Sequence, residues 1–177
     1  MPGPSSTAPA TTVAAQLQLD DASVALIESP HAATLLAAAD SMLAPNGAQA
    51  FACRVAADRR AVQVVVAASQ AEAVLANLAA TRRVALVACH IRSYQTVQLK
   101  GDDAAIVAAS DADRRDASRY CEEFAAYADS LGYPLPVMRA HMQCPPEQVV
   151  VVRFSVRHAF NQTPGPAAGE PIPTAAP

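Results

Sequence analysis

The sequence predicts a mainly β domain with peripheral helices, of the α+β class, and three observations carry this prediction. Short runs rich in β-branched residues recur along the centre of the chain, as in Ala61–Ala67. Apolar and polar residues alternate in 96–100, where Val97 and Leu99 point one way and their neighbours the other. Strands and helices do not alternate regularly, as they would in a doubly wound sheet. An antiparallel barrel of about six strands fits these patterns best.

The expected strands follow one another with turns or helices between them. Pro45, Asn46 and Gly47 predict the first turn, and Asp58–Arg60 the second. A buried apolar run leads into the alternating strand that Gly101 ends. The expected strands are His31–Ala39, Ala48–Ala57, Ala61–Ala67, Val84–Cys89, Thr96–Lys100, Ala104–Ala109 and a final long strand, Val149–Phe160.

Three helices are expected at the edges of this sheet. Asp20 is a typical N-cap for a short helix through Ile27. Ser69, with Glu72 three residues later, predicts a capping box for a second helix. Ser110 and Asp113 begin the longest one, which runs to about Leu131, and residues 133–146 are expected to be irregular.

Composition limits the classes of protein that the chain can belong to. Of its 177 residues, 52% are hydrophobic and 16% charged, which indicates one globular domain. We place it at residues 19–163, between a disordered leader, 1–18, and a Pro/Ala-rich tail, 164–177. A net charge of −3 argues against a nucleic-acid partner, and no apolar run is long enough to span a membrane. Four cysteines without CxxC spacing, and no evident secretory signal, predict a cytoplasmic protein with free thiols.

Motifs for common chemistries are not found in the sequence. It contains no GxSxG elbow, no glycine-rich phosphate loop and no HExxH pattern. Cys89 and His90 are adjacent, but neighbouring strand residues point to opposite faces, so we expect no metal site. Arg54 stands among small side chains, which leaves room for a flat ligand with an anionic end, although a lone arginine is also typical of a surface.

One segment carries a family resemblance. Residues 83–101, RVALVACHIRSYQTVQLKG, resemble the central strand pair of the pyridoxamine 5′-phosphate oxidase-like family of FMN-binding split barrels, in particular a bacterial subgroup whose strand ends in QLKG. The order of elements agrees, and residues 162–169 resemble the terminal motif of that subgroup. The resemblance covers about residues 20 to 170 and implies a six-stranded antiparallel split barrel of the FMN-binding type.

The resemblance also implies a cofactor, a partner and a set of binding residues. In that family two subunits pair and FMN lies at their interface, so the resemblance implies a homodimer with FMN. It places Gln98 and Lys100 against the flavin, and Arg54 and Ser69 at its phosphate. The full set of implied cofactor-binding residues is Arg54, Ser69, Gln70, Gln95, Thr96, Gln98 and Lys100.

Two departures from the family pattern bear on the phosphate. Ala67-Ala68-Ser69-Gln70 replaces a segment that usually carries arginine or lysine, and Gln95 stands where the subgroup tends to have arginine. Each charge-assisted contact to a phosphate stabilises binding by about 1.5–3 kcal/mol, so losing two weakens the expected site.

Three functions are therefore in competition. The first is an FMN-dependent oxidoreductase acting on an unidentified small molecule, and no residue stands out as its acid or base. The second is a non-catalytic carrier or sensor with weak or no flavin. The third is haem binding on the same barrel, with His90 or His158 as the ligand.

Overall fold

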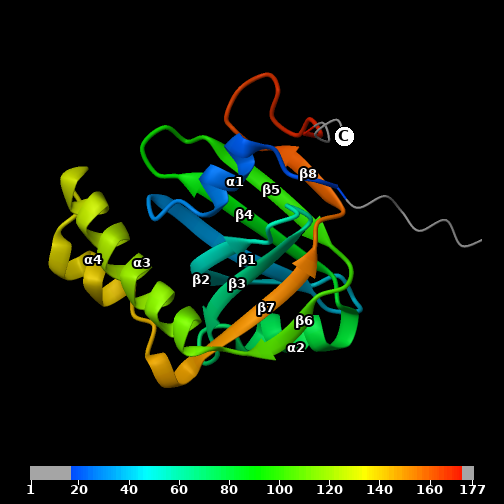
Figure 1. Cartoon of the computed structure of the whole chain (residues 1–177), viewed down its shortest axis with the longest axis horizontal. Helices are drawn as coiled ribbons and strands as arrows, with labels where there is room; N and C mark the ends of the chain where they lie inside the picture. Colours follow the sequence, from blue (N-terminus) through cyan, green and yellow to red (C-terminus); the bar gives the residue numbers. More distant parts are fainter. Residues whose placement is uncertain (1–16, 173–177) are drawn as a thin grey trace, which may run out of the picture.

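Eight antiparallel strands form a single curled sheet in the computed structural model, which describes residues 17–172 (Figure 1). Their order across the sheet is β6-β7-β3-β2-β1-β4-β5-β8. The strands are β1 (Ala32–Ala39), β2 (Pro45–Val55), β3 (Ala61–Ala67), β4 (Val84–His90), β5 (Thr96–Gly101), β6 (Ala105–Ala108), β7 (Val149–Ser155) and β8 (His158–Asn161). The mainly β, α+β class predicted from the sequence is confirmed.

The concave side of the sheet holds the larger of two hydrophobic cores. Every second residue of the central strands points into it, as Val62, Val64, Leu86 and Leu99 do, and each of these is fully buried. Helix α1 (Asp21–Ile27) packs against this core just before β1 begins, and α2 (Glu72–Thr81) packs at the end of β1. The two short helices therefore close opposite ends of the curl.

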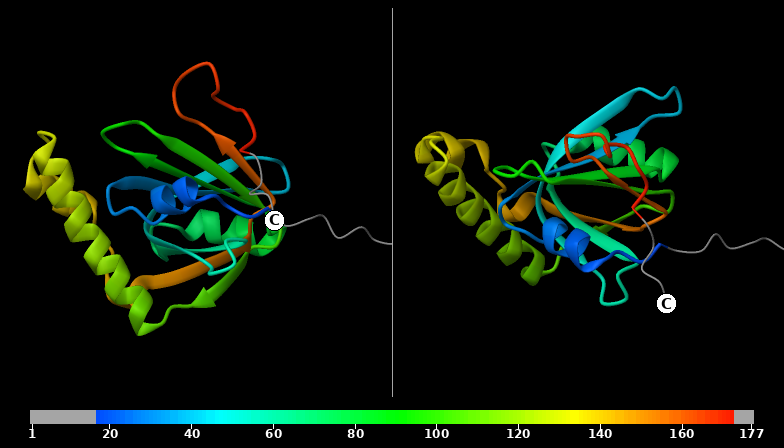
Figure 2. Two further views of the ribbon diagram at one scale, coloured as in Figure 1. Left: turned by 45° about the horizontal axis from the view of Figure 1, so that its top comes forward. Right: turned by 90° about the horizontal axis from the view of Figure 1, so that it is seen from above.

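The second core lies on the convex side, between the sheet and a pair of helices. Helix α3 (Asp111–Ser130) packs over β2, β3 and β7, and α4 (Leu135–His141) runs beside α3 (Figures 1 and 2). Phe51 and Val65 of the sheet meet Tyr120 and Phe124 of α3 there, and the Tyr120 hydroxyl donates to the Ala32 carbonyl at 2.6 Å. A short 3₁₀ turn, Pro146–Gln148, leads from α4 into β7.

Two helix starts agree with the sequence and one does not. The Asp20 carboxylate caps α1, and Ser110 and Asp113 form a reciprocal capping box on α3, as predicted. The predicted capping box at Ser69 and Glu72 is wrong. The N-cap of α2 is Ala71, which makes no side-chain cap bond, because the Ser69 hydroxyl donates to Gln148 instead.

The predicted strand count of six is also wrong, because eight strands form. The expected long strand Val149–Phe160 breaks at Val156–Arg157 into β7 and β8. The two parts pair with different strands, β7 with β3 and β6, and β8 with β5. The expected turn at Pro45–Gly47 is the beginning of β2, since the chain reverses earlier, around Asp40, whose carboxylate accepts from the Met42 and Ala44 amides.

Residues 133–146 were expected to be irregular, but they contain α4. Pro136 lies in the first turn of this helix, where its missing N–H leaves no hydrogen bond unmade. The prolines in this segment therefore mark where a helix begins as well as where α3 has ended.

The chain ends lie partly outside the described residues. Of the predicted leader, residues 1–16 are not described, whereas Leu17 is buried and its N–H donates to the Val156 carbonyl at 3.2 Å. Of the predicted tail, residues 173–177 are not described, and Pro171 forms a bridge with Phe160. Within residues 17–172, no helix is both long and apolar enough to cross a membrane.

Candidate functional site

The alternating strand β5 separates a core face from an outer face. Val97 and Leu99 are buried in the first core, whereas Thr96, Gln98 and Lys100 point to the convex side. The alternation predicted from the sequence is confirmed.

The convex face over β1, β4, β5 and β8 is a part of the sheet that α3 and α4 leave uncovered. Strand register places side chains of this face in rows across the strands, such as Leu35–Val87–Gln98–Phe160. The adjacent row is Ala37–Ala85–Lys100–His158. We call these eight residues the open face. Leu35 is 47% exposed, which is unusual for a leucine in the middle of a strand and shows that this part of the sheet is uncovered.

Three side chains give the open face a polar side. The Lys100 ammonium lies 5.1 Å from the centroid of the Phe160 ring, within cation–π range. His158 stacks on the same ring, with centroids 6.2 Å apart. The Gln98 amide makes no hydrogen bond within residues 17–172, so its donor and acceptor are available. Lys100 is also the only lysine of the chain.

Gln95 and Thr96 lie at the far end of β5, where they line a pocket of about 380 Å³. The Thr96 N–H donates to the Thr163 hydroxyl at 3.0 Å, so the strand is tied to the loop after β8. Asp20 and Glu170 bring carboxylates to the pocket, and no arginine or lysine is among the described residues that line it. Its charge therefore suits a phosphate poorly.

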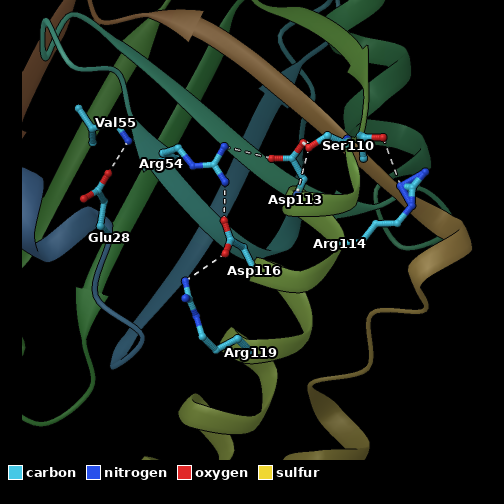
Figure 3. Close-up of polar contacts among 9 residues, drawn as sticks. Glu28, Arg54, Val55, Ser110, Asp113, Arg114, Asp116 and Arg119 are labelled. Carbon is cyan, nitrogen blue, oxygen red and sulfur yellow. Dashed lines mark hydrogen bonds and ion pairs between the residues drawn. The ribbon is translucent and has the colours of Figure 1, made fainter.

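Arg54 points from the convex face of β2 toward the first turns of α3 (Figure 3). Its guanidinium forms ion pairs with Asp116 and, at 3.4 Å, with Asp113. The hydrogen bond to Asp116 is the main reason why the pKa of Arg54 is raised. Burial would raise the pKa of Asp113, but hydrogen bonds from Ser110 and the charge of Arg54 outweigh it and leave that pKa lowered. The predicted phosphate ligand is thus already held by two carboxylates.

Ser69 and Gln70 lie in the exposed turn between β3 and α2. The Ser69 hydroxyl donates to the Gln148 side chain, and the Gln70 amide donates to the Gln143 carbonyl at 2.8 Å. Both side chains therefore tie this turn to the segment between α4 and β7.

One chain brings only some of the predicted residues together. Thr96, Gln98 and Lys100 share the outer side of β5. The row of Lys100 reaches β2 at Gly47, seven residues from Arg54, which is about 20 Å along the strand. A ligand on Lys100 therefore cannot reach the Arg54 of the same chain without spanning most of the sheet.

The two histidines considered as haem ligands have different surroundings. His90 ends β4, and its Nδ1 accepts from the backbone N–H of Ser93 at 3.2 Å. This contact fixes the orientation of the ring at the start of the loop after β4. His158 is exposed on the open face.

Phe160 is a site residue that sequence reasoning missed. In one unbroken strand it would share the side of Phe154 and Val156, which face the core. The break at Val156–Arg157 shifts the alternation by one residue, so Ala159 is buried and Phe160 faces outward. The sequence carries no clear signal for this break.

A second missed feature is an aromatic cluster at the edge of the same face. His31 stacks on Tyr127 of α3 with centroids 3.9 Å apart, and His90 lies 5.7 Å from Tyr127. The cluster joins the end of α3 to β1 and β4.

The cysteines do not form a thiol site. All four are free, and burial raises the pKa of Cys53 and Cys144 to about 12 and that of Cys121 to about 11. Such thiols carry almost no thiolate near neutral pH, so they are poor nucleophiles there.

A structure of HupZ from Group A Streptococcus has the same overall fold. It is 16% identical in sequence, the match covers 86% of this chain and 100% of that one, and the TM-score is 0.51. The chain is a split barrel. At this identity the likeness extends to the fold and no further.

Other solved structures similar to the chain include members of the family that the sequence resembles. One, from Lactobacillus delbrueckii, has been given a provisional assignment as a pyridoxamine 5′-phosphate oxidase; it is 19% identical over 81% of this chain and 93% of that one, with a TM-score of 0.49. Another is HutZ, the haem storage protein of Vibrio cholerae, 12% identical over 80% and 93%, with a TM-score of 0.44. Both likenesses are too distant to assign a ligand to this split barrel.

No protein-family model matches the sequence. No curated protein matches it either.

Proposed function

We propose that this split barrel binds FMN on its open face and acts as a flavin-dependent oxidoreductase on a small molecule. The observation that carries the proposal is the row Leu35–Val87–Gln98–Phe160, in which three apolar side chains form a strip across the strands with one amide that makes no hydrogen bond within residues 17–172. A planar ring system can lie on such a strip and bury its apolar area, while an amide satisfies the polar edge of the ring.

The ring half of FMN fits the open face well. Gln98 would donate to or accept from the pyrimidine edge of the isoalloxazine, and Lys100 would place a positive charge beside it. When bound, the flavin would supply the electron chemistry. The chain would orient the ring and shield one of its sides from water.

The phosphate half does not fit within one chain. Arg54 is paired with two carboxylates, Ser69 donates to Gln148, and the pocket beside Gln95 and Thr96 is lined by carboxylates without a described cation. These residues remain predictions as phosphate ligands. A partner subunit is one source of the positively charged side chains that the phosphate needs.

Pairing of two chains through the open face is part of the proposal. A second copy seated there would cover Leu35 and Val87, which one chain leaves in contact with solvent. It would also enclose a flavin between two sheets and exclude water from the ring. We therefore keep the homodimer predicted from the sequence.

The decisive experiment is a visible absorption spectrum of the purified protein, before and after addition of FMN and removal of the excess. Retained flavin is the expected result. The Lys100→Ala and Gln98→Ala variants should each weaken FMN binding by about tenfold, because each removes a polar contact to the ring. Arg139→Ala is the matched control, since Arg139 pairs with Glu122 on the distant surface of α3. If both open-face variants bind FMN as tightly as the original protein, the flavin ring does not bind on this face.

The uniqueness of Lys100 permits a second measurement. A reagent selective for amines can modify this side chain and the N-terminus alone. FMN bound on the open face should slow modification of Lys100 and leave the N-terminus unaffected. Peptide mass analysis separates the two sites.

Haem is the second candidate, favoured by one observation. His158 is exposed on the open face, where it lies directly opposite Lys100 on the neighbouring strand and stacks on Phe160. An imidazole and an aromatic ring are therefore both available to a flat ligand. Haem binding through His158 predicts a Soret band that is lost in His158→Ala and kept in His90→Ala. Flavin binding predicts that neither histidine matters.

A non-catalytic carrier or sensor is the alternative within the same fold. It is supported by the ion pairs of Arg54, the predicted phosphate ligand, with Asp113 and Asp116. Stopped-flow reduction of the flavin-loaded protein by NADH or NADPH distinguishes the two: an oxidoreductase is expected to be reduced and reoxidised in cycles, whereas a carrier holds or releases the flavin unchanged.

A further inference from the structure

Three polar side chains lie side by side on the convex face, beyond the N-terminal end of α3. Register pairs Arg54 of β2 with Gln63 of β3, and Gln63 with Arg153 of β7. All three point away from the first core, because Val55, Val62, Val64 and Phe154 beside them are buried in it. The Cβ atoms of directly opposed residues on adjacent strands lie about 5 Å apart, so this row places two arginine side chains on either side of one glutamine side chain.

The row borders a real pocket. Arg54, Gln63 and Arg153 line a cavity of about 160 Å³ whose remaining walls are the small residues Val55, Ala56 and Ala61. Small neighbours leave the guanidinium groups accessible from one side. The volume suits a tetrahedral oxyanion and excludes a flavin ring.

The two arginines that line this pocket differ in their ion pairs. Arg54 is divided between Asp113 and Asp116, whereas Arg153 forms no ion pair with any residue from 17 to 172. Arg119 also contacts Asp116, at 3.1 Å, so this carboxylate has a second cation to hold it when Arg54 turns away. Within residues 17–172 one cation of the row is therefore unpaired, and the other is shared with two carboxylates.

We propose that Arg54, Gln63 and Arg153 form a binding pocket for a phosphate group. Arginine presents a planar set of donors that matches two oxygens of a phosphate, and the Gln63 amide can donate to a third. Asp113 and Asp116 compete with the ligand for Arg54 and so lower the affinity of the pocket. The ligand is either free inorganic phosphate or the phosphate of a larger monoester that extends into solvent.

Isothermal titration with inorganic phosphate tests the pocket without any flavin. The intact protein is expected to bind with a dissociation constant near or below about 1 mM. Arg153→Gln should weaken binding by about tenfold or more, because it removes the unpaired cation. Asp116→Asn should strengthen binding several-fold, because Arg54 loses a competing carboxylate. Arg139→Gln, on a surface ion pair elsewhere, is the control and should change nothing.

Arg153→Gln and Asp116→Asn are expected to change phosphate affinity in opposite directions, so the proposal can be tested even if one variant folds poorly. Thermal unfolding of each variant checks the fold first. No binding by the intact protein up to about 10 mM phosphate, or equal binding by Arg153→Gln, overturns the pocket. A loss of affinity in Asp116→Asn would overturn the role of that carboxylate as a competitor.

FMN and riboflavin, which differ by one phosphate, distinguish the two sources of the ligand. If Arg153→Gln weakens FMN but not riboflavin, the pocket takes the phosphate of a monoester. If it weakens inorganic phosphate and leaves both flavins unchanged, the pocket takes the free ion. Because the phosphate titration involves no flavin, failure of the pocket and failure of the proposed function are separate results.

Discussion

The two halves of the convex face make a direct comparison. Over β2, β3 and β7 the sheet is covered by α3 and α4, and Phe51 and Val65 of the sheet are buried beneath them. Over β1, β4, β5 and β8 the same sheet carries Leu35, Val87 and Phe160, which remain partly exposed. Both halves carry large apolar side chains, but within residues 17–172 helices cover only one of them.

The difference teaches where stability and binding are located. Burial of aromatic side chains under α3 contributes to the stability of the single chain. Comparable side chains on the open face contribute little to a single chain, because water still reaches them. Their apolar area is available to a flavin or to a second subunit.

Replacing one phenylalanine in each half should separate the two roles most clearly. Phe124→Ala removes a buried ring that stacks on Tyr120, with centroids 5.6 Å apart, and should lower the free energy of unfolding by about 3–5 kcal/mol. Phe160→Ala should lower it by less than about 1 kcal/mol. Urea denaturation at one protein concentration measures both. Equal losses would mean that the open face is part of the folding core.

Two glycines give a smaller contrast. A methyl group at Gly101 would lie 2.6 Å from Phe154 Cδ2 and 2.8 Å from the Ser155 carbonyl oxygen, so Gly101→Ala should cost about 1–3 kcal/mol through overpacking. At Gly47 the nearest atom is a Leu35 methyl at 3.5 Å, an ordinary contact, and Gly47→Ala should be nearly neutral. Thermal unfolding compares the pair. A neutral Gly101→Ala would show that Phe154 can move aside.

Asp113 makes the stability of the covered half of the sheet depend on pH. Its pKa is lowered in the folded state from an ordinary value of 3.8, so its contribution to stability is present above that value and is lost as the pH falls through the folded pKa. Asp113→Asn should weaken the capping box of Ser110 and Asp113 and lower the free energy of unfolding by about 1 kcal/mol at neutral pH. It should also flatten the loss of stability below about pH 4. Denaturation midpoints between about pH 3 and 7 measure the slope, and an unchanged slope would contradict this role.

Leu35→Lys should have the smallest effect on the folded chain and a large one on association. On a surface already 47% exposed, the change should alter the free energy of unfolding by about 0.5 kcal/mol or less. If two chains pair through the open face, a buried charge at this position should prevent pairing. Sedimentation velocity measures the mass. Val137→Lys, at an exposed position on α4, is the control and should leave association unchanged.

Local patterns predicted most of the individual elements. Asp20 and the Ser110–Asp113 pair begin helices as expected, because a cap depends on a few neighbouring residues. Ser69 failed as a cap because Gln148, distant in sequence, takes its hydroxyl. The break between β7 and β8 was missed because it depends on which strands each half pairs with.

The candidate site was predicted in part. Gln98 and Lys100 do share the outer side of β5, since alternation within one strand is local information. Phe160 and Leu35 were not recognised as their neighbours, because the register between strands is set by pairing. Arg54 as a phosphate ligand stays a prediction, but the sequence did not indicate its two carboxylate partners, which belong to a helix about sixty residues later in the chain.

The sequence by itself determined the α+β class, the ends of α1 and α3, and the polar side of β5, because these follow from periodicity and capping over a few residues. Only the tertiary structure decided which half of the convex face α3 covers, where the last strand changes its alternation, and which partners Arg54 takes. These outcomes depend on contacts between segments far apart in the chain, and such contacts leave no periodic pattern in the residues that make them.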